Sequence, residues 1–121
     1  MLKLSALLGT AGLALLLAAA SPWTGSAPAS EGAARGRALF SGKGCAQCHS
    51  HAAVPESGHF ATDGQMAPDL TDRPLDAGYL RRWLRDPAAV RPDATMPNLG
   101  LSDDEIEALI VFLREPPQRG D

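Results

Sequence analysis

The clearest hydrophobic pattern in this chain lies near its C-terminal end. Between residues 102 and 114, apolar side chains recur three or four positions apart, as on one face of an α-helix. These side chains are Ile106, Leu109, Ile110, Phe112 and Leu113. Ser102 and Glu105 have the spacing of a capping box at the start of this helix, and Pro116 and Pro117 would stop it. The pattern predicts a well-capped C-terminal helix.

A second helical pattern covers Asp76 to Asp86. Leu80, Trp83 and Leu84 share one face there, and the following proline would end the helix. No stretch alternates apolar and polar residues for long enough to support a sheet. The expected fold class is therefore all-α, with irregular connections over residues 50–75 and 87–101. Loops of this length in a small domain commonly enclose something functional.

A third helix is expected from Glu31 to Phe40, with Ser30 as its N-cap and a glycine-rich break over residues 41–44. Gly32 and Gly36 lower its intrinsic stability by about 1 kcal/mol each relative to alanine. If the helix forms, a glycine there would let another element approach closely. We expect that element to be the C-terminal helix.

The N-terminal segment has the pattern of an export signal. Residues 1–20 run from Lys3 through an apolar stretch into small residues. Residues 4–20 also approach the length of about 17–25 residues that spans a membrane, so a tether is the alternative. The expected division is a signal peptide or anchor with a linker over 1–29, a folded domain over 30–115 and a tail over 116–121. We expect cleavage after Ala20 or Ala29 and a periplasmic domain, either soluble or anchored to the inner membrane.

Composition narrows the classes of function. The chain has 121 residues with a formal net charge of −3, so nucleic acid is not an expected partner. Only 5% of the residues are aromatic, which indicates a thin core for a single small domain. A large flat cofactor would supply the missing apolar bulk.

The chemistry of the chain is concentrated in the stretch CAQCH, residues 45–49. A zinc site would need four ligands, and the histidines lack the spacing of a second ligand pair. A redox dithiol expects a βαβ context, and a structural disulfide in an exported protein is a further alternative. The favoured interpretation is the C-x-x-C-H signature of one covalent haem c. Cys45 and Cys48 would bind the two vinyl groups, and His49 would ligate the iron.

The sixth iron position determines the type of haem protein. An axial methionine gives electron transfer, whereas a vacant position gives ligand binding or peroxide chemistry. We expect Met96 as the ligand, because the helix over 76–86 can carry the chain around the haem edge and Pro92 and Pro97 restrict the loop. Met66 remains an alternative. A haem-based sensor or peroxidase-like protein with an open sixth position is the rival function.

Four stretches follow one another in a familiar order: GRALFSGKGCAQCH, APDL, YLRRWLRDP and MPNLGLSDDEIEALIVFL. Together they resemble the class I cytochromes c over residues 31–113, including single-haem bacterial domains fused to subunit II of haem-copper oxidases. The resemblance implies about three to five short helices wrapped around one covalent haem. It also implies a one-electron carrier with no substrate turnover of its own.

The resemblance assigns further roles. Gly36 and Phe40 match residues of the first helix that pack against an aromatic of the last helix, here Phe112. Pro68 matches the proline whose carbonyl accepts a hydrogen bond from Nδ1–H of the ligating histidine, here His49.

For two other residues, more than one role stays open. Trp83 and Arg73 are candidates to line the haem or its propionates, with core packing and solvent exposure as their respective alternatives. His51 and His59 match no ligand position, and we expect both at the surface.

The expected partners are redox proteins, such as a terminal oxidase or a cytochrome bc-type complex. Lys43, Arg35 and Arg37 lie close in sequence to the cysteines, where a haem edge would be exposed. Weak, salt-sensitive docking onto these cations is the expectation, and simple solvent exposure is the alternative.

Overall fold

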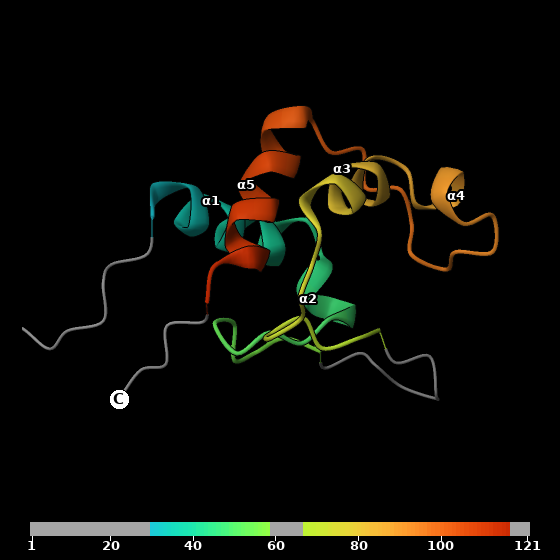
Figure 1. Cartoon of the computed structure of the whole chain (residues 1–121). Coiled ribbons are helices and arrows are strands. Elements are labelled where there is room, and N and C mark those ends of the chain that lie inside the picture. Colours follow the sequence, from blue (N-terminus) through green and yellow to red (C-terminus); the bar gives the residue numbers. More distant parts are fainter. Residues whose placement is uncertain (1–29, 59–66, 117–121) are drawn as a thin grey trace, which may run out of the picture.

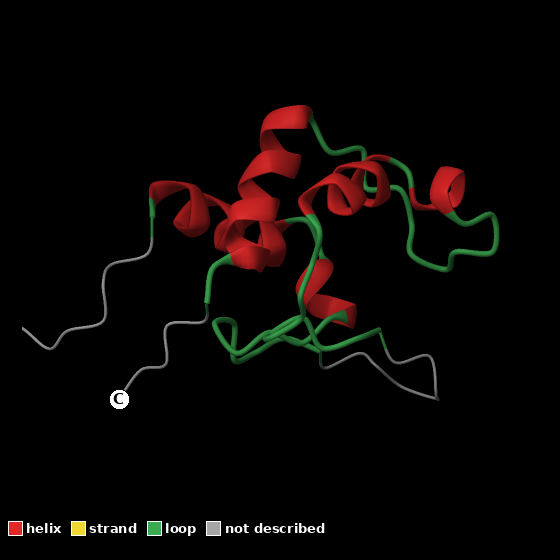
Figure 2. Cartoon of the chain, viewed as in Figure 1, coloured by secondary structure: helices red, strands yellow, loops and turns green. Residues whose placement is uncertain are grey.

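The computed structural model describes residues 30–58 and 67–116. Within these two ranges the chain forms five helices and no β-strand (Figures 1 and 2). They are α1 (Glu31–Gly42), α2 (Cys45–Cys48), α3 (Ala77–Arg85), α4 (Pro87–Val90) and α5 (Asp103–Arg114). The all-α prediction is confirmed. The predicted leader and tether, His59, Met66 and the tail beyond residue 116 lie outside the described residues.

Helices α1 and α5 cross at the centre of the molecule (Figure 1). Gly36 is buried at this crossing. A Cβ atom on Gly36 would lie 2.1 Å from the carbonyl oxygen of Ala108 and 2.5 Å from Cβ of Phe112. No side chain fits at such distances, so glycine is what allows the two backbones to meet. The predicted close approach is confirmed.

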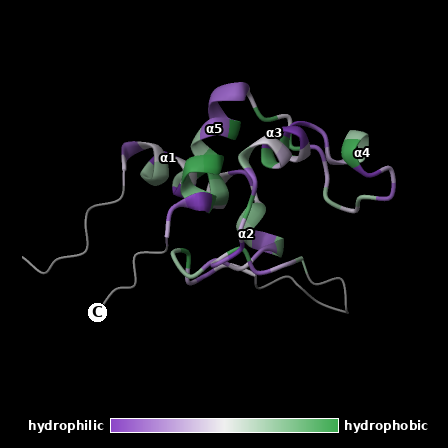
Figure 3. Cartoon of the chain, viewed as in Figure 1, coloured by the Kyte–Doolittle hydropathy of each residue, from purple (hydrophilic) through white to green (hydrophobic). Residues whose placement is uncertain are grey.

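Helix α5 begins and packs as its sequence predicts. The Ser102 hydroxyl accepts the Glu105 N–H at 3.3 Å, and the Glu105 carboxylate accepts the Ser102 N–H at 3.0 Å. All five predicted apolar positions are buried. Figure 3 shows a hydrophilic first turn and an apolar segment near the crossing with α1. Glu105 also forms an ion pair with Lys43 at 2.8 Å, which links the end of α1 to the start of α5.

Helix α3 packs against α5 through Leu80 and Leu84, both buried. The Asp76 side chain caps α3 by accepting the Tyr79 N–H at 2.7 Å. On the solvent side, Arg81 binds the carboxylate of Glu107 on α5, with 2.8 Å between Nη2 and Oε2. The position of α3 is thus set by an apolar face inside and by ion pairs with α5 outside.

The sequence predicts an irregular connection over residues 87–101, and this prediction is wrong for its first four residues. They form helix α4. The Asp86 side chain accepts the Ala89 N–H at 3.3 Å and so caps a new helical turn. Pro87 is the first residue of that turn, where its missing N–H removes no hydrogen bond. Pro87 therefore ends α3 and starts α4. Helix α4 and the loop after it extend away from α1 (Figure 1).

His51 is buried, so the prediction that it lies at the surface is wrong. Only 3% of its surface is exposed, and its ring lies 4.5 Å from the Phe112 ring and 5.9 Å from the Phe40 ring, centroid to centroid. Its Nδ1 accepts the Ala53 N–H at 3.1 Å, and its own N–H donates to the Ser57 hydroxyl at 2.8 Å. These turn contacts direct the ring inward. Burial lowers the pKa of His51, which favours the neutral imidazole that this packing requires.

No helix among residues 30–58 and 67–116 is both long and apolar enough to cross a membrane.

Candidate functional site

The two cysteines occupy the single turn of α2, directly after α1. Gly44 makes the junction in a left-handed conformation, with φ of +85°, which a residue with a Cβ rarely adopts. Cys45 is buried, Cys48 is exposed, and both are free thiols. His49 follows with extended backbone. One helical turn therefore presents two thiols in succession, and the imidazole follows at its end.

The His49 ring is held by the loop that returns beside it. Its Nδ1 lies 2.9 Å from the carbonyl oxygen of Pro68, the contact that the family resemblance implies. A carbonyl only accepts, so Nδ1 carries the proton of a neutral His49. Nε2 is then the unprotonated nitrogen, which is the form that binds a metal.

Backbone and side-chain bonds keep the Pro68 segment in place. The Leu70 N–H donates to the carbonyl of Ser50 at 3.0 Å, and the Ala52 N–H donates to the Thr71 hydroxyl at 3.0 Å. Asp69 accepts the Thr71 N–H at 2.8 Å. Hydrogen bonds from Thr71 lower the pKa of Asp69 and keep this carboxylate charged. The histidine is thus oriented by a loop with its own support.

Met96 lies in the loop between α4 and α5. Its sulfur accepts the indole N–H of Trp83 at 3.0 Å, and both residues are half-buried. The Tyr79 ring stacks on Trp83 with 5.8 Å between centroids and 15° between planes. Sequence reasoning named Trp83 and Met96 separately and missed their contact. They lie thirteen positions apart in the sequence, and no helical spacing links α3 to this loop.

The residues present fit a haem. Two free thiols, an imidazole with an available nitrogen and a thioether are the donors that covalent haem c uses. Several leucines pack against the core while only partly buried, namely Leu70, Leu75, Leu99 and Leu101. Such half-covered apolar surface suits a flat apolar ring. Among residues 30–58 and 67–116, no three His, Cys, Asp or Glu side chains gather to hold a metal ion.

The alternative of a reactive dithiol is opposed by the environment of Cys45. Burial raises the pKa of the Cys45 thiol, and the neighbouring Cys48 adds to the rise. A thiol that attacks disulfides needs a lowered pKa, because the thiolate is the nucleophile. The described part of the chain also lacks the strands of a βαβ unit.

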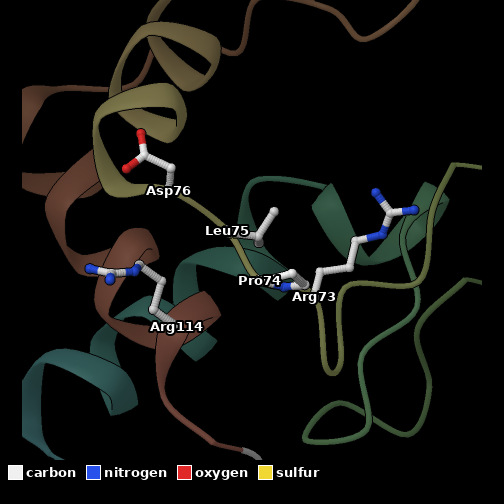
Figure 4. Close-up of a pocket in the computed structure, with 5 residues that line it drawn as sticks. All are labelled: Arg73, Pro74, Leu75, Asp76 and Arg114. Carbon is white, nitrogen blue, oxygen red and sulfur yellow. The ribbon is translucent and has the colours of Figure 1, made fainter.

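Arg73 lies at a separate surface pocket. Pro74, Leu75, Asp76 and Arg114 line this pocket with it, and none of the predicted haem-binding residues does. Figure 4 shows the exposed Arg73 side chain pointing away from Asp76 and Arg114. Its role toward haem propionates stays a prediction.

The three cations expected near the haem edge, Arg35, Arg37 and Lys43, lie in different surroundings. Arg35 and Arg37 are exposed on α1. Lys43 forms the ion pair with Glu105, so its charge is already partly compensated.

One comparison with known proteins gave a match. Residues 31–113 match the family described as cytochrome c oxidase, cbb3-type, subunit III. The matched range runs from the first residue of α1 almost to the end of α5. No curated protein and no solved structure matches the chain significantly.

Proposed function

Because this chain belongs to the cytochrome c family described as cbb3-type oxidase subunit III, we propose that it carries single electrons through one covalent haem c. Cys45 and Cys48 attach the haem, and His49 and Met96 are the iron ligands. The bound haem supplies one-electron Fe(II)/Fe(III) chemistry. The observation that supports this most is the His49–Pro68 hydrogen bond, because it leaves Nε2 available beside the cysteine pair.

Each part of the protein has a defined task in this proposal. Pro68 orients His49 and strengthens its basicity through the Nδ1 hydrogen bond. Half-buried leucines that covered a bound ring would keep water from it, which would disfavour the more highly charged ferric state. Histidine and methionine ligation also favours the ferrous state, so the reduction potential is expected to be positive.

Ligand-specific absorption tests the iron ligands. Ferric haem with an axial methionine has a weak long-wavelength band, which the wild-type protein should show. Met96→Ala should abolish this band, and Met66→Ala should leave it intact. Loss of the band in Met66→Ala alone would contradict the ligand set. A wild-type protein without the band, whose ferrous form binds carbon monoxide readily, would support the open-site rival.

The proposed partner is a membrane oxidoreductase that faces the exported domain, such as a terminal oxidase or a cytochrome bc-type complex. Its support is the oxidase named by the matched family. Docking at α1 is tested with Arg35→Glu and Arg37→Glu, which should slow electron transfer and weaken its salt dependence. Arg91→Glu is the control, because Arg91 is the C-cap residue of α4. Helix α4 lies on the opposite side of the molecule from α1 (Figure 1). If the electron-transfer rate changed neither with salt concentration nor in Arg35→Glu and Arg37→Glu, the proposed docking surface on α1 would be contradicted.

A further inference from the structure

Two large apolar side chains are exposed in the described part of the chain, Tyr79 on α3 and Val111 on α5. The Tyr79 ring differs from Val111 in what lies beneath it. With 38% of its surface exposed, Tyr79 stacks on the half-buried Trp83 indole, with 15° between the ring planes and 5.8 Å between centroids. The two rings lie four positions apart, so they share one face of α3. The stack therefore joins the solvent to a half-buried indole.

The inner end of this stack reaches the proposed sixth iron ligand. The indole Nε1 of Trp83 lies 3.0 Å from the sulfur of Met96. Electron transfer through a protein slows steeply with every gap between atoms, so groups in contact carry electrons better than open space does. One hydrogen bond and one ring stack thus give a continuous route of contacts from the Met96 sulfur to the surface of α3.

The arginines of α3 differ in their ion pairs. Arg81 and Arg85 are bound by carboxylates of α5. Arg82 is exposed, and no carboxylate in the described part of the chain lies within ion-pair distance of it. It follows Tyr79 by three positions, so the two side chains are neighbours on the helix surface. Helix α3 thus presents an arginine without an ion pair beside its exposed ring.

This surface has the composition and charge of a docking site for a redox protein. Tyrosine, tryptophan and arginine are the residue types that contribute most at protein interfaces. A positive charge beside a route to the iron fits a partner with acidic groups around its own redox centre, because complementary charges guide transient docking. Helix α3 packs against α5 and makes no contact with α1. The site is therefore separate from the cations of α1.

We propose that Tyr79, Arg82 and Trp83 form a second electron-exchange surface, the α3 surface, where an acidic redox protein docks and electrons pass through the stacked rings. This inference rests on the proposed function, because it requires Met96 as the sixth iron ligand. One electron leaves the reduced centre of the partner and converts Fe(III) to Fe(II), while Tyr79 and Trp83 keep their protons. A carrier with two contact surfaces can accept electrons at one and donate them at the other.

Stopped-flow reduction of the haem-loaded ferric protein tests the charge of the α3 surface. The probe is reduced flavodoxin, a small acidic protein that donates single electrons. Rates are measured in the background Arg35→Glu/Arg37→Glu, where docking at α1 is weakened. There, Arg82→Glu should slow second-order reduction roughly two- to tenfold at low salt and have little effect at high salt, because salt screens exposed charges. The matched control is Arg91→Glu, another exposed arginine, which should leave the rate unchanged.

Tyr79→Leu tests the electron route in the same background. Leucine keeps an apolar side chain and removes the outer ring, so the first-order rate within the bound complex should fall while its salt dependence and the midpoint potential stay as they are. Val111→Ala, at the other exposed apolar position, should leave the rate unchanged. Unchanged rates in Tyr79→Leu and Arg82→Glu would overturn the proposal. Equal losses in the control variants, or a loss explained by a shifted midpoint, would also overturn it.

A second measurement needs neither a variant nor electron transfer. NMR of the isotope-labelled ferrous protein mixed with fully reduced flavodoxin should show shifted signals for Tyr79, Arg82 and the Trp83 indole. Shifts confined to α1 would overturn the proposal.

The Met96→Ala spectrum separates this inference from the proposed function. If the methionine band survives in Met96→Ala, the ligand set fails and this inference with it. If the band is lost while the α3 variants and the NMR signals show no effect, only this inference fails.

Discussion

At the scale of single residues, Gly36 gives the sharpest test of the fold. Gly36→Ala would drive a methyl group into the Ala108 carbonyl at the crossing of α1 and α5, where backbone cannot move aside. We expect a loss of about 1–3 kcal/mol or more in the free energy of unfolding, as for other overpacked cores. Chemical denaturation of the haem-loaded protein measures it.

Gly42→Ala is the matched control in the same helix. A Cβ at Gly42 meets nothing within 4 Å, and its backbone is helical. Alanine there should stabilise the protein by about 0.4–1 kcal/mol, because it restricts the unfolded chain. Similar destabilisation by both changes would show that helix propensity, and not the close approach, determines the result.

The surroundings of a single residue were predictable where its residue type has one common structural role. A close approach at one of the glycines of α1 was predictable from their low helix propensity, and the family resemblance indicated Gly36. His51 was not, because its burial depends on the turn contacts with Ala53 and Ser57 and on two rings from α1 and α5. Histidine is found in both buried and exposed positions, so its type alone decides nothing.

At the scale of elements, the link between α1 and α5 has a pH dependence. Two interactions lower the pKa of Glu105 below its usual value of 4.5. The larger is the ion pair with Lys43, and the second is the hydrogen bond from the Ser102 N–H. A lowered folded-state pKa stabilises the protein at pH values above the unfolded pKa, and this contribution is lost as pH falls through the folded value.

Glu105→Gln keeps a side chain that can complete the capping box and removes the charge. At neutral pH the variant should melt at a lower temperature than the wild type. The difference should shrink as pH falls below 4.5, because the wild-type carboxylate then becomes protonated. Thermal melts of both proteins across this pH range measure it. A difference that stays constant with pH would show that the charge on Glu105 contributes nothing to stability.

Helices with a full apolar face were predictable from periodicity, as α3 and α5 show. Helix α4 was not, since four residues carry no period. Its only sequence signal is Asp86 directly before Pro87, an N-cap followed by a proline at the first helical position. The sequence pattern predicts only a helix stop at this proline, whereas Pro87 both follows the end of α3 and begins α4.

At the scale of the whole molecule, local signals place the cysteines and His49, whereas contacts between distant segments complete the candidate site. The His49–Pro68 contact was expected from the family resemblance and not from spacing. The Trp83–Met96 contact depends on how α3 and the loop before α5 meet, which no local pattern encodes. The same holds for the leucines that pack half-buried against the core.

Those half-buried leucines predict that the haem contributes to folding. The variant Cys45→Ala/Cys48→Ala cannot attach haem covalently, so half-buried leucines such as Leu70 and Leu99 would lose the ring proposed to cover them. Losing about 2 kcal/mol or more of apolar burial should lower the melting temperature by roughly 10 °C or more, since each 1 kcal/mol shifts a domain of this size by about 4–8 °C. Circular dichroism of the haem-free variant and the loaded wild type measures the difference. Cys48→Ala alone, which keeps one thioether attachment, should fall between them. Equal melting temperatures for the haem-free variant and the loaded protein would show that the helices form their core without the cofactor.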